Sequence, residues 1–394
     1  MVSSKGEIRA KAIEVESVPH RFYMVAGEPS GDLHGSNLIR AIKQVSPNAD
    51  IRCWGGDKMQ AEGGTVVKHY KELAFMGFVE VVLNLRTILR NLDFCKKDIL
   101  RFRPEVLVLI DYPGFNLRLA KWARQQGIKV AYYIAPQVWA WKEGRVKMMK
   151  KCIDEMLVIL PFEKTYFETK WQWDVHYVGH PLMEVIERKK SIGAEPLVPT
   201  NPVSIQKPIV ALLPGSRRQE IKKKLPVMLA VSPAFPQYQF VVAQAPGLEP
   251  SFYNQFVKDY PEVALVTDQT YDLLMQARAA LVTSGTATLE TALFEVPEVV
   301  CYKGSEISYQ IAKRVINIQY ISLVNLIMNQ EVVKELIQGE MTTANITREL
   351  DLLLHDEART NTLRQDYEKL REKLQADGSA SAKAAAIIMA LAAR

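Results

Sequence analysis

Cysteine is scarce in this chain, which contains only four in 394 residues. The four lie far apart in the sequence and no two form a closely spaced pair, so they make neither a structural zinc motif nor an evident disulfide framework. The scarcity favours a reducing compartment, and we expect the protein to be cytoplasmic. The four are Cys53, Cys95, Cys152 and Cys301.

The sequence also lacks a hydrophobic run that we expect to cross a membrane. Residues 226–248 carry no charge over 23 positions, but they include four prolines and three glutamines, whose polar groups and helix-breaking rings lipid would not accommodate. Residues 1–20 mix acids with lysines and have no apolar core, so we expect a disordered leader and not a signal peptide.

Metal-binding patterns are missing as well. His34 and His180 are isolated, no further ligands follow at a zinc spacing, and no Asp-X-Asp pair is present to hold a nucleotide-bound divalent cation. We therefore predict no metal and no cofactor.

The loop MVAGEPSGDLHG, residues 24–35, lacks the spacing of known phosphate-binding loops. Its glycines recur every four residues, at Gly27, Gly31 and Gly35. That spacing matches neither the dinucleotide fingerprint nor the Walker loop, and no lysine follows. Glu28 and Asp32 would also repel a phosphate. The residues alone leave a capped turn and a ligand-facing backbone both open.

Charge is distributed unevenly along the chain. The net charge is +6, yet residues 1–190 hold 30 Lys and Arg against 22 Asp and Glu, whereas residues 191–394 hold 20 against 22. The basic first half is consistent with an anionic partner such as a phosphorylated ligand or an acidic membrane surface, or simply with a solvated face. We expect no nucleic-acid partner.

Short apolar runs alternate with helix-length segments, which is typical of parallel strands joined by crossover helices. The chain is long enough for two domains. We predict a leader at 1–20, a Rossmann-like domain at 21–190, a Pro-rich linker at 191–207, a second Rossmann-like domain at 208–355 and C-terminal helices at 356–394 that pack back on the first domain. The expected strands are 21–26, 49–54, 105–111, 129–134, 155–160 and 175–179, then 208–214, 239–244, 263–267, 279–283 and 298–303, after which the chain is predicted helical. The predicted fold is α/β, with two doubly wound domains facing a cleft and ligands at the carboxyl ends of the strands.

Two loops of the second half suit a nucleoside diphosphate. LLPGSRRQE, 212–220, leads from a strand into a helix, and so does LVTSGTATLE, 281–290. Helix-terminal N–H groups and an arginine can bind phosphates, and a carboxylate one turn into the second helix can accept from ribose hydroxyls. Ordinary capped turns are the alternative. The candidate residues are Gly215, Ser216, Arg217, Ser284, Gly285, Thr286 and Glu290.

In the first half, Asp111 ends the predicted strand 105–111 and is followed by Pro113 and Gly114. A carboxylate at that position is suited to act as a general base, although aspartate also caps helices. Trp139 and Trp141 lie among basic residues in IAPQVWAWKEGRVK, either as core anchors or as a ligand platform.

Residues 79–103 form an amphipathic stretch. A helix packed on the core is the default interpretation, but apolar side chains mixed with bases would also suit an anionic membrane surface. The candidate membrane patch is Val79, Val82, Leu85, Ile88 and Leu89 with Arg86 and Arg90.

Taken together, the motifs resemble those of lipid-A-disaccharide synthases, a family of inverting, metal-independent glycosyltransferases with the GT-B fold. The resemblance runs from about residue 21 to 340, in family order. It is carried by VAGEPSGDLHG, MQAEG, LAFMGFVEV, IDYPGFN, PQVWAW, LPFEK, VGH, LLPGSR, SGTATLE and YISLVNLI.

The resemblance implies a reaction in lipid A biosynthesis in a Gram-negative bacterium. UDP-2,3-diacylglucosamine would donate its sugar to 2,3-diacylglucosamine 1-phosphate, giving the β(1→6) tetraacyl disaccharide 1-phosphate and UDP. It further implies peripheral association with the cytoplasmic face of the inner membrane. The helical tail leaves a homodimer open.

The resemblance also assigns roles to individual residues. Asp111 matches the family's likely base, Arg217 its GSR arginine and Glu290 its nucleotide-side glutamate. Asn325 matches an asparagine that faces the nucleotide. The sequence departs from relatives with a second acid in the IDxPxF motif, because Gly114 stands there. Asp111 is therefore predicted to act without a carboxylate partner in the motif.

With the nucleotide assigned to the second half, the opening loop becomes the expected acceptor side of the site. The acceptor-side candidates are Gly27, Glu28, Ser30, Gly31, Asp32 and Trp139. Two alternatives stay open at this point: an enzyme like UDP-N-acetylglucosamine 2-epimerase, and a non-catalytic, membrane-associated nucleotide-sugar binder.

Overall fold

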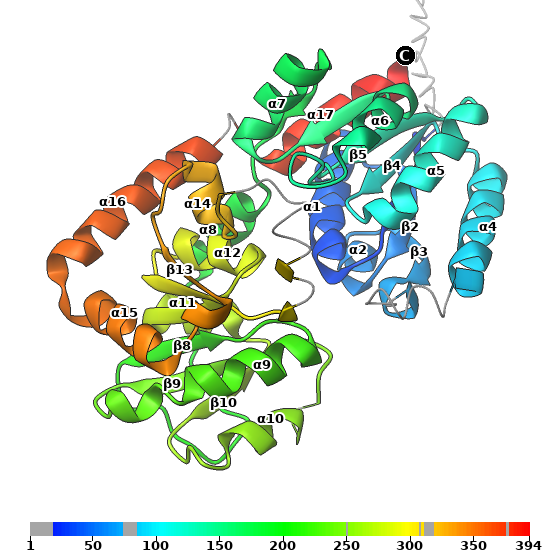
Figure 1. Ribbon diagram of the computed structural model, residues 1–394. Coiled ribbons are helices and arrows are strands. Elements are labelled where there is room, and N and C mark those ends of the chain that lie inside the picture. The colour runs from blue at the N-terminus through cyan, green and yellow to red at the C-terminus, as the bar shows by residue number, and fades with distance from the viewer. Residues whose placement is uncertain (1–18, 74–84, 250, 307–308, 311–318, 376–377) are drawn as a thin grey trace, which may run out of the picture. The chain divides into compact units, whose positions relative to one another are not determined.

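Two sheets of parallel strands, each flanked by helices, organise the computed structural model (Figure 1). The structure describes residues 19–73, 85–249, 251–306, 309–310, 319–375 and 378–394. The predicted leader lies almost entirely outside these residues. The described chain divides into two compact units, one up to Ala131 together with Ala385–Arg394 and one over Tyr132–Ala384. The domain limits predicted from the sequence stay a prediction.

The first sheet has seven strands in the order β3-β2-β1-β4-β5-β6-β7. Its strands are β1 (Arg21–Ala26), β2 (Asp50–Gly55), β3 (Thr65–His69), β4 (Val106–Ile110), β5 (Lys129–Tyr133), β6 (Glu155–Val158) and β7 (His176–Tyr177). β4 is buried along its whole length because helices cover both faces, which is why it has a continuous Val/Leu/Ile sequence without polar alternation.

The second sheet has six strands in the order β10-β9-β8-β11-β12-β13. Its strands are β8 (Ile209–Leu213), β9 (Gln239–Gln244), β10 (Ala264–Thr267), β11 (Ala277–Thr283), β12 (Glu298–Tyr302) and β13 (Lys334–Ile337). All the pairings within this sheet are parallel.

Helices connect the strands in both sheets. In the first part of the chain they are α1 (Pro29–Val45), α2 (Asp57–Ala61), α4 (Leu85–Phe102), α5 (Pro113–Gln125), α6 (Val146–Cys152), α7 (Pro161–Trp171) and α8 (Leu182–Ile192). Later in the chain they are α9 (Arg218–Leu229), α10 (Ser251–Val257), α11 (Thr270–Gln276), α12 (Thr286–Leu293), α14 (Leu323–Met328), α15 (Thr343–His355), α16 (Glu357–Leu374) and α17 (Ala380–Ala393). Short 3₁₀ turns cover Tyr70–Leu73, Glu143–Arg145, Ser232–Ala234 and Gln338–Glu340.

The eleven predicted strands all occur, with ends shifted by at most two residues. Two more strands were not predicted. β3 is only half buried, and β13 contains a lysine and a glutamate, so neither has the apolar run that the prediction relied on. The prediction that the chain is helical after residue 303 is therefore wrong at β13. Its glutamate, Glu335, is tolerated because it accepts hydrogen bonds from the backbone N–H groups of Ile321 and Ser322.

The predicted linker is irregular but not detached. Asn201 binds the backbone of the edge strand β10. Its side chain donates to the Val263 carbonyl and accepts from the Leu265 N–H. Thr200 donates its N–H to the Leu265 carbonyl. The linker therefore covers an edge that would otherwise expose unpaired backbone groups.

The C-terminal helix α17 ends against the first sheet, because the Lys129 ammonium at the start of β5 donates to the carbonyls of Leu391 and Ala392. A cation at the carbonyl end of a helix satisfies backbone groups that have no partner within the helix.

Candidate active site

Each sheet has one switch point, where the strand order reverses. The connections that leave the two strands at this point lead to opposite sides of the sheet. In the first sheet it lies between β1 and β4, and in the second between β8 and β11. Ligands of doubly wound sheets bind at the carboxyl ends of such strands. The segments that leave these four strands contain eight of the residues predicted from the sequence: Gly27 and Glu28 after β1, Asp111 after β4, Gly215 and Ser216 after β8, and Ser284–Thr286 after β11.

The turn after β4 has an unusual backbone. Asp111 and Tyr112 both have positive φ, 45° and 50°. Residues other than glycine rarely adopt this left-handed backbone region. Such turns persist only where neighbouring groups stabilise them. Asn116 does so here. Its buried side-chain amide donates to the carbonyls of Val25, Ile110 and Asp111, at 3.2, 3.2 and 2.8 Å, and so ties the ends of β1 and β4 to the turn.

Gly27 lies directly under the ring of Tyr112. A Cβ placed on Gly27 would be 2.4 Å from Tyr112 Cδ1, so no larger residue fits without moving the ring. This contact explains the first glycine of the loop. Gly31 is similarly close to β1, because its Cβ would lie 3.0 Å from the Cβ of Ala26.

Asp111 is poised to exchange a proton near neutral pH. Burial, and to a lesser degree the negative charge of Glu28, raise the pKa of Asp111 to about 6, while a hydrogen bond from the Tyr112 backbone opposes the rise. A general base works best when its pKa lies near the operating pH. The charge of Glu28 therefore acts on Asp111, and the acceptor-side role of Glu28 stays a prediction.

Asp32 has other partners than a ligand. Its buried carboxylate accepts from the backbone N–H groups of Gly56, Lys58 and Met59 and so caps the start of α2. These contacts give Asp32 a structural role and do not support the predicted hydroxyl-binding role. Ser30, in contrast, is exposed at the start of α1.

The switch point of the second sheet contains a cavity of about 310 Å³. It is bounded by the ends of β8, β9 and β11 and by the starts of α11 and α12. Six of the predicted nucleotide-binding residues line it: Gly215, Ser216, Ser284, Gly285, Thr286 and Glu290. The N-terminus of α12 meets the cavity at Thr286, where free backbone N–H groups favour an anion.

Gly215 is required by the loop after β8. It has a φ of 109°, and a Cβ there would lie 2.7 Å from the Glu220 carboxylate. Glu220 in turn lies between Arg217, 3.4 Å away, and the buried ammonium of Lys224, 3.9 Å away. The loop is thus held by a group of charges on the first turns of α9.

Glu290 is oriented by a residue that the sequence did not indicate. The hydroxyl of Tyr271 on α11 donates to Glu290 Oε1 at 2.6 Å. Burial, followed by the charge of Glu290, raises the pKa of Tyr271, so the hydroxyl stays a donor. No motif in the sequence indicates which carboxylate Tyr271 meets, because the two residues lie 19 positions apart on different helices.

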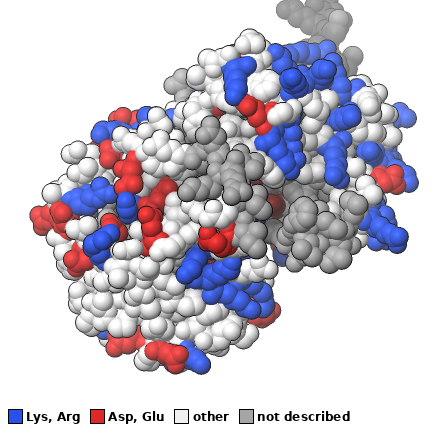
Figure 2. Space-filling view, viewed as in Figure 1, with Lys and Arg blue, Asp and Glu red and all other residues white. Residues whose placement is uncertain are grey.

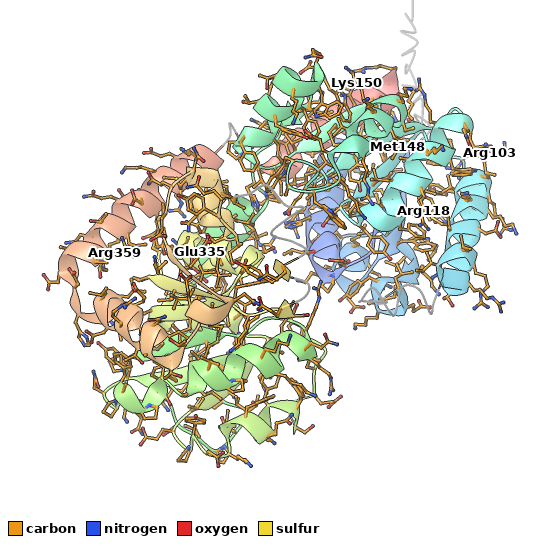
Figure 3. The ribbon with its side chains drawn as sticks, viewed as in Figure 1. Arg103, Arg118, Met148, Lys150, Glu335 and Arg359 are labelled. Atoms are coloured by element: carbon orange, nitrogen blue, oxygen red, sulfur yellow. The ribbon has the colours of Figure 1, made fainter. Side chains whose placement is uncertain are left out.

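Two predicted nucleotide contacts do not line the cavity. Arg217 is exposed beside Glu220. Asn325 is fully buried, and its amide donates to the Val333 carbonyl and to Glu335 while its oxygen accepts from Val332 and Val333. Those four hydrogen bonds give Asn325 a structural role between α14 and β13. Figure 3 labels its partner Glu335, and Arg359 of α16, which donates to the Val332 carbonyl.

The two tryptophans of the PQVWAW segment differ in exposure. Trp139 is half buried, packs edge to face on Phe162 and donates to Glu163 Oε1 at 3.1 Å. Trp141 is 50% exposed, with the Lys142 ammonium 3.8 Å from its ring centroid. Trp139 is therefore anchored in the core, and Trp141 is the one that presents an indole to the surface.

Only part of the candidate membrane patch can be placed. Val79 and Val82 lie outside the described residues. On α4, Ile88 lies on the same face as the buried Leu92, whereas Leu89 is 51% exposed and has exposed Arg86 and Arg90 beside it. Figure 2 shows many Lys and Arg side chains on the surface around α4. α4 thus combines an inner apolar face with an outer face that is basic and partly apolar.

Within the described residues, no helix is long and apolar enough to span a membrane, and no three His, Cys, Asp or Glu side chains are grouped as metal ligands.

Comparison with known proteins decides the family. The family model described as lipid-A-disaccharide synthetase matches residues 22–389, nearly the whole chain. The chain belongs to the lipid-A-disaccharide synthase family. Its members are glycosyltransferases of lipid A biosynthesis, and the resemblance seen in the motifs is confirmed.

Curated relatives agree along the full length. The lipid-A-disaccharide synthase of Trichlorobacter lovleyi is 36% identical over 378 residues, which are 95% of this chain and 98% of that protein. The enzyme of Syntrophus aciditrophicus is 38% identical over 381 residues, 93% and 96% of the two chains.

Solved structures support the predicted GT-B fold. A glycotransferase of kitacinnamycin superposes with a TM-score of 0.65 at 14% identity, covering 95% of this chain and all of that one. A UDP-GlcNAc 2-epimerase from Neisseria meningitidis, solved with UDP-GlcNAc, has a TM-score of 0.59 at 12% identity, covering 94% and 98%. Because both enzyme classes share the fold, the fold does not choose between transferase and epimerase, whereas the family match does.

Proposed function

We propose that this synthase transfers the sugar of UDP-2,3-diacylglucosamine to 2,3-diacylglucosamine 1-phosphate with inversion, releasing UDP. The observation that carries the proposal is the cavity at the β8–β11 switch point, lined by six of the predicted nucleotide-binding residues. Two loops there offer backbone N–H groups and hydroxyls for a diphosphate, and Glu290 offers a carboxylate for ribose hydroxyls.

Asp111 serves as the general base in this proposal. Its carboxylate takes the proton from the 6-hydroxyl of the acceptor while O6 attacks C1 of the donor sugar. The C1–O bond to UDP breaks in the same displacement, so the configuration at C1 inverts and the new linkage is β(1→6). The raised pKa of Asp111, about 6, suits this task, because the carboxylate is ionised at neutral pH and still basic enough to accept a proton.

The substrates carry acyl chains, and we propose that the enzyme meets them at the cytoplasmic face of the inner membrane. The outer face of α4 supports this, since Leu89 is exposed next to Arg86 and Arg90. A base near an anionic lipid surface contributes roughly 1 kcal/mol, and an apolar side chain adds to it on insertion, so the association would be peripheral and reversible.

A two-substrate assay tests the proposal. The protein is incubated with UDP-2,3-diacylglucosamine and 2,3-diacylglucosamine 1-phosphate, and products are followed by chromatography and mass spectrometry. We expect equal amounts of UDP and tetraacyl disaccharide 1-phosphate, with a β anomeric signal by NMR. UDP release that does not need the acceptor, or conversion of UDP-N-acetylglucosamine into its 2-epimer, would contradict it.

A further inference from the structure

We propose that Gln244 selects the nucleobase of the donor, by donating a hydrogen bond from its side-chain amide to a carbonyl oxygen of a uracil-like base. The inference rests on the proposed nucleotide-sugar function and identifies the base that the cavity recognises.

Gln244 is the last residue of β9 and lines the cavity together with Ser216 and Thr286. The register shows which way it faces. Leu212 of β8 pairs with Val242 of β9 and with Leu281 of β11, so these three side chains share a face of the sheet. Because side chains alternate along a strand, Gln244 and Thr283, two residues further on, project on that same face at the carboxyl edge.

The amide of Gln244 has a defined orientation. Its oxygen accepts from the hydroxyls of Thr200 and Thr267, at 3.0 and 2.5 Å. A separation of 2.5 Å lies within the range of O–H···O hydrogen bonds and below that of N–H···O bonds, so the atom facing Thr267 is the oxygen. The amide nitrogen is consequently the donor that is left over.

That donor is buried and has no hydrogen-bond partner among the described residues. The Gln244 side chain is only 3% exposed, and Nε2 is one of the few buried polar atoms left unsatisfied. Thr283 Oγ1, also in the cavity lining, is in the same condition. A buried amide N–H without a partner is costly, and native proteins rarely leave one at a site unless a ligand completes it.

Gln239, at the other end of β9, allows a comparison of the hydrogen bonding of a buried glutamine that does not line the cavity. It begins β9, is equally buried, and makes a full set of hydrogen bonds. Its Nε2 donates to the carbonyls of Ser204 and Glu262, and its Oε1 accepts from the Gln206 N–H. The incomplete bonding of Gln244 is therefore particular to the cavity end of the strand.

The other parts of a nucleoside diphosphate already have partners in the proposed function. The loops at Gly215 and Gly285 take the phosphates and Glu290 takes the ribose, so the base is left for the part of the cavity that the end of β9 lines with Gln244, Ala245 and Pro246. Small apolar side chains suit a flat ring. The amide donor of Gln244 favours a carbonyl oxygen, as in uracil, and disfavours the amino group that cytosine carries in its place.

The test compares UDP and CDP by isothermal titration calorimetry, with wild type and Gln244→Leu. We expect wild type to bind UDP about ten- to a hundredfold more tightly than CDP, the range that one unpaired buried donor implies. In Q244L, UDP should bind about tenfold more weakly and the two affinities should come within about threefold of each other. Gln239→Leu is the matched control. It removes the same side chain from the same strand and should lower the melting temperature without changing the UDP to CDP ratio.

The inference is overturned if wild type does not distinguish UDP from CDP, or if a folded Q244L keeps the wild-type ratio. Should Q244L fail to fold, Thr267→Val decides. It keeps Gln244 but removes a hydroxyl that orients the amide, so the ratio should fall several-fold, and an unchanged ratio overturns the inference. Failure of the proposed function looks different: wild type would then bind no UDP at all. UDP binding that depends on Glu290 and not on Gln244 would defeat this inference alone.

Discussion

Among single residues, Asp111 and Glu28 are coupled by charge, and the proposed function makes Asp111 the general base. Asp111 has to be ionised to accept a proton, and burial together with Glu28 holds its pKa at about 6. We therefore expect kcat/KM to be constant at pH values well above 6, to be half of that value near pH 6, and to fall about tenfold per pH unit below it.

Replacing Glu28 with Gln tests this electrostatic coupling. Removing a nearby negative charge makes the ionised form of Asp111 easier to reach, so its pKa falls and the acid limb of the profile moves to lower pH. Rate profiles between pH 4.5 and 8 measure the shift. Glu105→Gln at the opposite end of β4 is the control, and its acid limb should stay at the wild-type position. An E28Q limb that stays in place or moves to higher pH would show that Glu28 does not act on Asp111.

Tyr271 holds the carboxylate of Glu290, the residue that we propose binds the ribose. Tyr271→Phe removes the hydroxyl that holds the Glu290 carboxylate and should raise the KM for the nucleotide sugar by about tenfold while kcat stays within about threefold. Steady-state kinetics separate the two constants. Tyr166→Phe, which breaks a similar bond to Glu143, is the control and should leave both unchanged. A fall in kcat with unchanged KM would contradict the assignment.

At the scale of secondary structure, the contrast between predicted and observed elements has a physical origin. β4 and β8 were predicted because each is a continuous apolar run buried on both faces. β13 was not predicted because Lys334 and Glu335 interrupt the apolar pattern. The buried carboxylate of Glu335 is stabilised by hydrogen-bond donors from residues 321, 322 and 325.

The same limit applies to the site. Residues at strand ends such as Asp111 and Ser216 could be predicted, since the ends of parallel strands gather at one edge of a sheet. The directions of Asp32 and Asn325 could not, because each is decided by backbone groups of another element. For Tyr271, Asn116 and Gln244 no local pattern signals their partners.

β12 contains a buried carboxyl group, that of Glu298, whose effect on stability can be measured. Glu298 is 1% exposed and neither carboxylate oxygen has a hydrogen-bond partner among the described residues. Burial, with a contribution from Glu335, raises the pKa of Glu298 well above 4.5. The folded state keeps the proton that the unfolded state releases above that pH. Glu298 therefore lowers stability as pH rises, by about 1.4 kcal/mol per pH unit until its folded pKa is reached.

Glu298→Gln should remove this dependence. Thermal unfolding at pH 5, 6, 7 and 8 measures it, and the stability of E298Q relative to wild type should grow with pH because contributions of other groups cancel in the difference. A difference that is independent of pH would mean that the carboxyl group is ionised in the folded protein.

As a whole molecule, the protein combines a glycosyltransferase fold with a basic outer face on α4. We expect the combined substitutions Leu89→Ser, Arg86→Ser and Arg90→Ser to reduce co-sedimentation with vesicles rich in anionic phospholipid by about tenfold or more, since each removed base contributes roughly 1 kcal/mol at such a surface. Leu352→Ser, at an exposed leucine of α15, is the control. Vesicle binding equal to that of wild type would exclude α4 as the contact.

The proposed role of Asp111 as the base of glycosyl transfer is tested by Asp111→Asn. Single-turnover formation of the disaccharide and UDP affinity are measured on the same preparation. We expect the rate to fall by about 10²–10⁴ while the UDP dissociation constant stays within about twofold of wild type. A variant that forms the disaccharide at the wild-type rate would contradict it.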